Sequence, residues 1–193
     1  MPESFDRIVL GSSVSVRDEA ITQLVSAGRG SLEFILGDDA CRHRLLGASI
    51  NWDRLLLAFK DSTVLGYAAF KFEGRGPFNV QLKDFVREFG RFAGALRYAL
   101  FCLSERRENR YQFFLYGLRV IKPARHQGIA SALLGQVFEQ AKAVGAPRVD
   151  LEILRRNQAA RKLYLENGFV GRRWPWPLKF PIEHMTRRVE VVR

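Results

Sequence analysis

The stretch "RVIKPARHQGIASALLGQV", Arg119 to Val137, decides the fold because it changes from an apolar run to an amphipathic pattern across one short loop. The apolar residues from Tyr111 to Ile121 predict a strand, and the apolar spacing after Gly128 predicts a helix. A helix that begins after a tight loop presents unpaired backbone N–H groups and the positive end of its dipole. The stretch therefore predicts an anion site, for phosphate above all.

The residues after this helix change from a strand pattern to a helix pattern a second time. "RVDLEIL" (148–154) predicts another strand, and "NQAARKLYLENGF" (157–169) predicts a short helix that ends at Gly168. A strand, a helix and a strand of these lengths form a βαβ unit. The two strands are therefore expected to be parallel neighbours.

The first third of the chain predicts a strand, two helices and a hairpin. "RIVLGSSVSV" (7–16) is rich in strand formers, and Ser15 with Asp18 has the spacing of a capping box at the start of a helix over 17–27. Residues 31–49 predict a second helix, which Gly37 interrupts. "RLLLAF" and "VLGYAAFKF" flank a turn and predict an antiparallel hairpin. One more strand is expected at the end of the chain, in "HMTRRVEVV".

The segment 74–110 predicts a long amphipathic helix, with a break expected at Gly90 or Gly94. Its apolar residues recur at helical spacing: Leu82, Phe85, Val86, Phe89, Phe92, Ala93, Leu96, Leu100 and Leu103. Such a stripe usually packs on its own domain. The alternatives are a lid over a substrate site, a dimer face or a membrane-surface helix.

Length and composition set the class of protein. A chain of 193 residues fits a single domain, and 47% hydrophobic with 26% charged residues is the balance of a soluble globular protein. The net charge of +11 favours phosphates, nucleic acid or a polyanionic cofactor. Two separated cysteines fit a reducing compartment, and neither a secretory leader nor an apolar run of membrane-spanning length is apparent. A cytoplasmic protein without a membrane partner is expected.

Two motifs resemble those of the GCN5-related N-acetyltransferase (GNAT) superfamily. The [RQ]xxGx[GA] signature of its pyrophosphate loop is filled by Arg125, Gly128 and Ala130. Its second hallmark, an Asn, an Ala, a Leu-Tyr pair and a Gly-Phe pair, is filled by Asn157, Ala160, Leu163, Tyr164, Gly168 and Phe169. The resemblance covers Leu118 to Phe169. Within it, "LEI" around Glu152 is similar to a motif of the ribosomal-protein alanine acetyltransferase branch.

The resemblance implies an α/β (α+β) GNAT fold in one domain, residues 1–193. It consists of a mixed, mostly antiparallel splayed sheet flanked by helices, with the helical insertion of about 74–110 between the third and fourth strands. Acetyl-CoA is the implied co-substrate, and no metal is implied. Its pantetheine arm would pair with the backbone of Leu118, Val120 and Ile121. The remaining implied cofactor contacts are Arg125, His126, Gln127, Gly128, Ile129, Ala130, Asn157 and Tyr164.

The resemblance also implies catalytic roles. Tyr164 holds the position of the general acid that protonates the departing CoA thiolate. The strand before the loop, where many members carry a carboxylate base, has none here, so Glu152 is the candidate base. A hydrogen-bonding residue of the sheet is the alternative for Glu152, and Asp150 on the same strand face is a weaker candidate. The three histidines lack metal-ligand spacing, and Trp174 and Trp176 are candidates for the wall of the acceptor pocket.

These observations predict an acetyl-CoA-dependent N-acetyltransferase that transfers an acetyl group directly to a primary amine in a ternary complex. The acceptor is expected to be an amine-bearing small molecule or peptide. The alternatives are a protein N-terminal or lysine acetyltransferase, or a non-catalytic basic module that binds RNA or the ribosome. A homodimer is a further alternative, through the 74–110 helix or the last strand.

Overall fold

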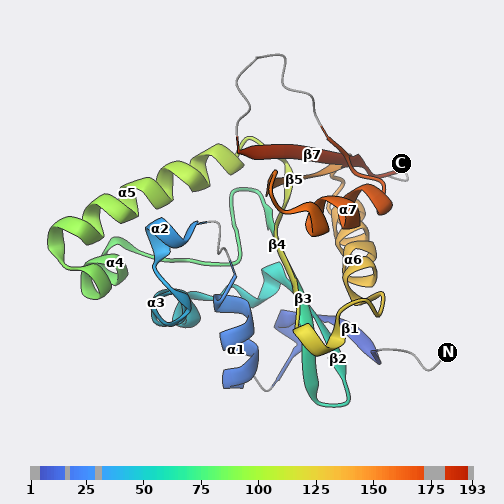
Figure 1. Cartoon of the computed structure of the whole chain (residues 1–193), viewed down its shortest axis with the longest axis horizontal. Coiled ribbons are helices and arrows are strands. Elements are labelled where there is room, and N and C mark those ends of the chain that lie inside the picture. Colours follow the sequence, from blue (N-terminus) through green and yellow to red (C-terminus); the bar gives the residue numbers. More distant parts are fainter. Residues whose placement is uncertain (1–4, 16–17, 29–31, 172–180, 191–193) are drawn as a thin grey trace.

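The computed structural model describes residues 5–15, 18–28, 32–171 and 181–190, so Trp174 and Trp176 lie outside the described residues. Its centre is a seven-stranded sheet of order β1-β2-β3-β4-β5-β7-β6 (Figure 1). The strands are β1 (Arg7–Leu10), β2 (Leu55–Lys60), β3 (Thr63–Phe72), β4 (Phe113–Val120), β5 (Arg148–Leu154), β6 (Val170–Gly171) and β7 (Ile182–Arg188). The pair β4–β5 is parallel, and the other neighbouring pairs are antiparallel. The mixed, mostly antiparallel sheet and the parallel neighbours predicted from the βαβ unit are confirmed.

The parallel pair opens almost as soon as it forms. β4 and β5 are paired at Phe114 and Asp150 alone, although both strands continue beyond this point. On its other edge β4 stays paired to β3 from Phe72–Phe113 to Gly66–Val120. A register shift between Ala69 and Phe70 lies within that pairing, and such a bulge increases the local twist. The sheet is therefore splayed between β4 and β5.

Helices cover both faces of the sheet (Figure 1). One face carries α1 (Glu19–Ser26), α2 (Glu33–Leu36), α3 (Asp39–Leu46), α4 (Leu82–Phe89) and α5 (Arg91–Glu108), and the other carries α6 (Ile129–Ala143) and α7 (Gln158–Glu166). Strand alternation supplies both faces with apolar side chains. In β2, Leu55 and Leu57 join the cluster under α1, whereas Leu56 and Ala58 join the cluster under α6.

The predicted helical insertion lies between β3 and β4, as expected, and Gly90 divides it into α4 and α5. Gly90 has a φ of 80°, a left-handed conformation that glycine adopts without strain. Phe85 and Phe101 turn inward and form an apolar cluster with residues of α2 and α3. Phe92 and the later leucines do not share that cluster. The stripe expected on one helix is therefore split into a buried part and an exposed part.

Two local predictions for the first helices need correction. Asp18, not Ser15, is the N-cap of α1, because its Oδ1 accepts a hydrogen bond of 2.9 Å from the Ile21 amide. The single helix expected over 31–49 is two helices, α2 and α3, separated at Gly37, whose φ is 79°. Asp38 then caps α3 by accepting from the Cys41 amide at 2.8 Å. Among the described residues, no helix has the length and apolar character needed to cross a membrane.

Candidate active site

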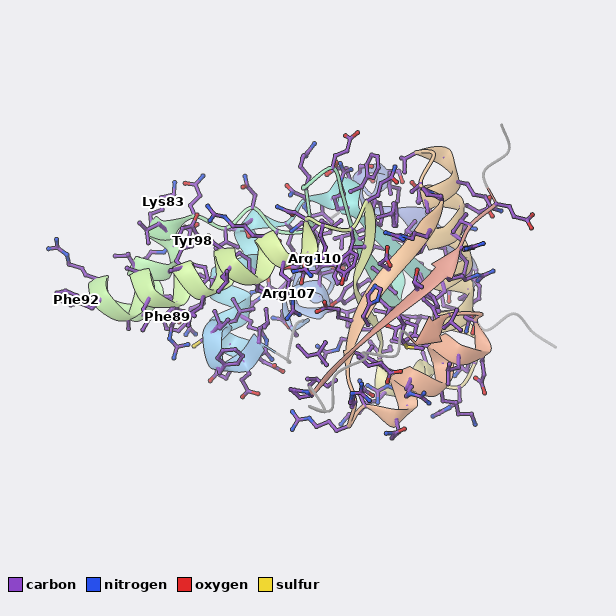
Figure 2. All side chains as sticks on the ribbon, turned by 90° about the horizontal axis from the view of Figure 1, so that it is seen from above. Lys83, Phe89, Phe92, Tyr98, Arg107 and Arg110 are labelled. Carbon is purple, nitrogen blue, oxygen red and sulfur yellow. The ribbon has the colours of Figure 1, made fainter. Side chains whose placement is uncertain are left out.

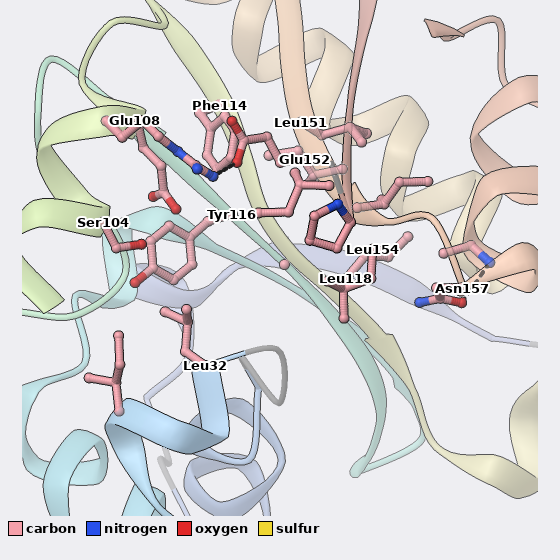
Figure 3. A pocket seen from close by; sticks show the side chains of 18 of the residues that line it. Leu32, Ser104, Glu108, Phe114, Tyr116, Leu118, Leu151, Glu152, Leu154 and Asn157 are labelled. Carbon is pink, nitrogen blue, oxygen red and sulfur yellow. Dashed lines mark hydrogen bonds and ion pairs between the residues drawn. The ribbon is translucent and has the colours of Figure 1, made fainter. Parts of the chain in front are cut away.

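The opening between β4 and β5 leads into a cleft of about 1160 Å³ (Figure 3). One wall comes from the two strands, with Leu118, Leu151 and Glu152 among its residues. The facing wall comes from α2 and the C-terminal half of α5. Asn157 and Tyr164 of the α7 segment line the same cleft. The cleft therefore brings together residues of the second sequence motif, of the strand that precedes the first motif and of the insertion.

The backbone of β4 has the arrangement that an additional strand needs. The Ile121 amide donates to the Leu65 carbonyl at 2.8 Å, so Ile121 and Leu65 are a hydrogen-bonded pair of the β3–β4 ladder. In an antiparallel ladder such pairs alternate with pairs whose N–H and C=O groups point away. By this alternation, the backbone groups of Leu118 and Val120 point away from β3, toward the opening. Two of the three predicted pantetheine contacts, Leu118 and Val120, therefore lie at the edge of β4 that faces away from β3.

Ile121 differs from the prediction. Besides the amide bond to Leu65, its carbonyl oxygen accepts from the Ala124 amide at 3.1 Å. Both of its backbone groups are therefore engaged within the chain, and they do not pair with an extended ligand. The strand has already turned into the loop at this residue, which is why the alternation ends at Val120.

The loop after β4 carries the predicted diphosphate contacts. Arg125, His126, Gln127 and Gly128 are exposed, and Ile129 begins α6. Gly128 is the N-cap of that helix with a φ of 80°, no side chain caps it, and a Cβ at this position would project into open space. His126 also has a positive φ, of 62°. No side chain therefore caps the first-turn amides of α6, which include those of Ile129 and Ala130.

The Arg125 side chain folds back onto the strand in this structure. Its Nε donates to the Val120 carbonyl oxygen at 3.2 Å, while the residue as a whole stays exposed. Gln127 donates from Nε2 to the Pro123 carbonyl oxygen at 3.1 Å. These bonds fix the loop against the end of β4. The Arg125 side chain engages the Val120 carbonyl oxygen at the strand edge, so a ligand that pairs with this oxygen has to share or displace that bond.

Asn157 and Tyr164 lie on the other side of the cleft. Asn157 is the N-cap of α7, because its Oδ1 accepts from the Ala160 amide at 3.2 Å. Tyr164 is buried and packs edge-on against Phe169, with ring centroids 5.5 Å apart. Burial, with a smaller contribution from Tyr67, raises the pKa of the Tyr164 phenol well above its ordinary value. Tyr164 is therefore fully protonated at neutral pH, and it lines the cleft.

Glu152 lies on the cleft wall with two partners. Arg107 of α5 forms an ion pair with its Oε2, and the Tyr111 hydroxyl donates to its Oε1 at 3.3 Å. The Tyr111 ring stacks on His184 and Phe114. Burial first, and then the neighbouring Glu152 carboxylate, raises the pKa of Tyr111 to about 12. Glu152 thus places a carboxyl group in the cleft, held by an arginine that the insertion supplies.

Asp150, the weaker candidate base, lies at the closed end of the opening. It is buried, pairs with Phe114 in the sheet and does not line the cleft. Its Oδ1 is 2.9 Å from Nε2 of His184, and its Oδ2 is 3.1 Å from Nε of Arg148. These contacts describe a structural residue that joins β5 to β7.

The insertion brings a second acidic group, which the sequence motifs did not indicate. The Tyr116 hydroxyl, on the cleft wall of β4, donates to Glu105 Oε1 at 2.8 Å. The buried Lys71 Nζ donates to Glu105 Oε2 at 2.6 Å and to its carbonyl oxygen at 3.0 Å. Glu108, one turn further along α5, is buried and lines the cleft (Figure 3). The helix α5 therefore brings two acidic side chains to this side of the sheet, of which Glu108 lines the cleft. The signal in the sequence was their i, i+3 spacing on the side of the helix opposite the apolar stripe.

Across the described ranges, no group of three or more His, Cys, Asp or Glu residues is arranged to hold a metal ion. The described cleft instead combines the edge of β4 at Leu118, a buried phenol and a carboxylate, and the open start of α6 follows β4 along the chain after one short loop. This combination suits a ligand with an extended arm and a diphosphate, and a reaction that moves protons.

The sequence model of the acetyltransferase (GNAT) family matches residues 31–169, which contain β2 to β5 and both motifs. The chain belongs to this family. This assignment confirms the predicted superfamily, which is a family of acetyltransferases. The likeness of "LEI" to the alanine acetyltransferase branch stays a prediction.

Two curated relatives match parts of the chain. A chloroplastic protein of Arabidopsis thaliana, named GCN5-related N-acetyltransferase 6, is 37% identical over 71 residues, which are 36% of this chain and 24% of the relative. A Bacillus subtilis (strain 168) protein, the uncharacterized N-acetyltransferase YycN, is 34% identical over 56 residues, 29% of this chain and 36% of the relative. The matches therefore span about a quarter and about a third of these relatives.

A solved structure described as an acetyltransferase is similar over almost the whole chain. It has a TM-score of 0.55 at 21% sequence identity, and the superposition covers 89% of this chain and 94% of the other. At this level of identity the likeness concerns the fold. It confirms the predicted α/β architecture for nearly all of the chain.

Proposed function

We propose that this protein transfers an acetyl group from acetyl-CoA directly to a primary amine, with both substrates bound in the cleft. The observation that carries the proposal is that the edge of β4, which lines the cleft at Leu118, runs directly into the loop that starts α6. A ligand with a thioester, an extended arm and a diphosphate matches that sequence of features. Membership of the GNAT family supports acetyl-CoA as the donor.

In this proposal the backbone of Leu118 and Val120 pairs with the pantetheine arm, as an added strand would. The amides of the loop and of the first turn of α6 hold the diphosphate, assisted by the helix dipole and the Arg125 guanidinium. Gly128 leaves room for a phosphate oxygen close to the backbone. The thioester then lies in the cleft between β4 and Tyr164.

The chemistry needs one proton acceptor and one proton donor. An alkyl ammonium has a pKa near ~10.4, so the acceptor amine must lose a proton before it attacks. Glu152 takes this proton, the amine nitrogen forms a bond to the acetyl carbonyl carbon, and the carbon–sulfur bond then breaks. Tyr164 donates its proton to the departing thiolate. The nitrogen still carries one proton more than an amide after the attack, and this proton passes to the Tyr164 phenolate as the carbon–sulfur bond breaks. Glu152 releases its proton to solvent, so that the products are an amide and CoA.

The ion pair with Arg107 restricts the role of Glu152. A carboxylate that accepts a hydrogen bond from a guanidinium can take a proton with its other oxygen, here Oε1, which faces the Tyr111 hydroxyl. Arg107 then keeps the carboxylate directed into the cleft. In this scheme α5 contributes to catalysis by positioning the base.

The test is the release of free CoA thiol from acetyl-CoA with a panel of primary amines. Tyr164→Phe should lower kcat by roughly 10²-fold or more at unchanged affinity for acetyl-CoA, and Glu152→Gln should cost a similar factor, as expected for lost acid–base catalysis. Glu139→Gln is the matched control, because Glu139 is an exposed residue of α6 paired with Lys142.

Unchanged kcat in Tyr164→Phe would remove this residue from the mechanism. RNA binding that weakens steeply with salt, without any CoA release, would instead favour a basic RNA-binding module on the same fold.

A further inference from the structure

The outer face of α5 carries a row of exposed apolar side chains. Phe92 is 93% exposed, Leu96 64% and Leu103 65%, and Leu100 lies between them. The opposite face of the helix is packed: Gly94 lies against the backbone of α4, and Phe101 is buried. Figure 2 shows Phe92 at the far end of the arm and Arg107 where the arm meets the sheet. The row is therefore a surface of the insertion that the described part of the chain leaves uncovered.

The spacing of this row is that of a helix–helix seam. Phe92, Leu96, Ala99 and Leu103 follow one another at intervals of four, three and four residues. This alternation is the pattern by which one helix receives the side chains of another at a small crossing angle. From Phe92 to Leu103 the row is about 17 Å long, at ~1.5 Å per residue, which is about three helical turns. The fitting partner is therefore a helix of several turns.

The row leads into the cleft. Leu100 and Leu103 belong to the cleft wall, together with Phe34 of α2, which is also exposed. A helix lying along the row would consequently end at the mouth of the cleft, where the acceptor amine has to enter. The surface and the proposed reaction site are continuous.

The charges at that end are basic. Arg106, Arg107 and Arg110 are exposed and line the cleft where the row ends. The acidic residues of α5 point inward, since Glu105 bonds to Lys71 and Tyr116 and Glu108 is buried. Pairing α5 with α5 of a second copy would bring arginines against Arg91 or against each other, which is unfavourable. Charge complementarity favours an acidic partner.

We propose that the outer face of α5 docks an acidic amphipathic helix of the acceptor protein. Its apolar face lies along Phe92, Leu96 and Leu103, and its acidic end lies against the arginines at the cleft. The helix runs antiparallel to α5, with its N-terminal amine directed into the cleft. The acceptor role rests on the proposed acetyl transfer, whereas docking of the helix does not.

A lipid surface fits this face less well. Membrane-surface helices present a broad apolar face with basic residues along the opposite side. Here the opposite side of α5 is packed against the protein, the apolar row is narrow, and its arginines gather at one end. A row of this shape, ending at a cleft, suits a helical peptide.

The test uses the full chain and two synthetic helical peptides of about 20 residues. Both have the same leucine seam and a free N-terminal amine; one carries glutamates at its N-terminal end, and its twin carries arginines there. Binding is measured by fluorescence anisotropy. The acidic peptide should bind at least tenfold more tightly than its twin, and the Phe92→Ser/Leu96→Ser variant should weaken this binding at least tenfold. Leu82→Ser, an exposed leucine on α4, is the matched control and should leave it unchanged.

Arg106→Glu/Arg110→Glu should remove the preference for the acidic peptide. Equal binding of the two peptides, or binding that the Phe92/Leu96 variant does not change, overturns the proposal. So does a dimer in sedimentation that Leu96→Ser disperses, or adsorption to phosphatidylcholine–phosphatidylserine vesicles without peptide binding. If the acidic peptide docks and no amine is acetylated, the proposed function fails alone. If short amines are acetylated and neither peptide binds, the docking surface fails alone.

Discussion

Replacing Lys71 by methionine should destabilise the protein and loosen the acceptor side of the cleft. Lys71 is only 3% exposed, and its ammonium group donates to the Glu105 carboxylate at 2.6 Å and to the Glu105 carbonyl oxygen at 3.0 Å. The other carboxylate oxygen accepts from the Tyr116 hydroxyl at 2.8 Å. Methionine keeps most of the buried volume but removes the cation. The variant therefore isolates the charge that ties α5 to the sheet.

Breaking a fully buried pair by removing one partner costs about 3–5 kcal/mol. The Glu105 side chain is 21% exposed, so water partly replaces the lost cation. We therefore expect the free energy of unfolding to fall by about 2–3 kcal/mol, less than for a fully buried pair. At about 2–4 °C per kcal/mol for a chain of this size, Tm should fall by ~4–12 °C. Thermal unfolding followed by circular dichroism measures this change.

The double variant Lys71→Met/Glu105→Gln is the control, because it removes both charges and keeps an acceptor for Tyr116. Neutral replacement of both members of a buried pair costs less than removal of one. The double variant should therefore be more stable than the sum of the two single changes predicts, by about 1 kcal/mol or more. In turnover assays, KM for the amine should rise in Lys71→Met while the affinity for acetyl-CoA stays constant. Additive stability changes, or a Tm unchanged by Lys71→Met, would refute the reasoning.

Two further predictions concern stability. Gly94→Ala should lower the free energy of unfolding by about 1–3 kcal/mol, as overpacking does, because a Cβ at this position would lie 2.4 Å from the Phe85 carbonyl oxygen. A denaturant titration measures this change. Gly135→Ala is the control in the same titration, because a Cβ at Gly135 would meet open space. Because the pKa of Tyr111 is raised to about 12 from ~10 in the unfolded chain, its contribution to stability is complete below pH ~10 and is lost as the pH rises through 12. Tm of the native chain should therefore fall more between pH 9 and pH 12 than Tm of Tyr111→Phe, and parallel losses would contradict this assignment.

The motifs between Leu118 and Phe169 made much of the site predictable from the sequence. A strand, a loop with glycine in a left-handed conformation and a helix are local features, and Gly128 has the φ that such a loop requires. The burial of Tyr164 was not predictable in this way. It depends on Phe169 and on the packing of α7 against the sheet, and these contacts are set by the fold as a whole.

The contribution of the insertion could not be predicted, because it depends on the direction in which α5 crosses the sheet. Arg107 reaches Glu152, and Glu105 reaches Tyr116 and Lys71, across sequence separations of 45, 11 and 34 residues. The helical periodicity of the sequence located the apolar positions of the insertion but did not show which of them pack in the core. Gly90 decides that question, since it lets α4 fold back on α5 and divides the stripe.

The measurement that tests the account most directly is a calorimetric titration of the full chain with acetyl-CoA, beside the same titration of Gly128→Glu. Gly128 is exposed, so the variant should fold, although glutamate at a φ of 80° adds some strain; its Tm is measured alongside. The new carboxylate would occupy the space in which the loop amides meet the diphosphate. We predict saturable binding of one acetyl-CoA by the native chain and a loss of at least tenfold in affinity in a folded Gly128→Glu protein. Equal affinity in the two proteins, or no binding to the native chain, would contradict the assignment of the loop and of the cleft it serves.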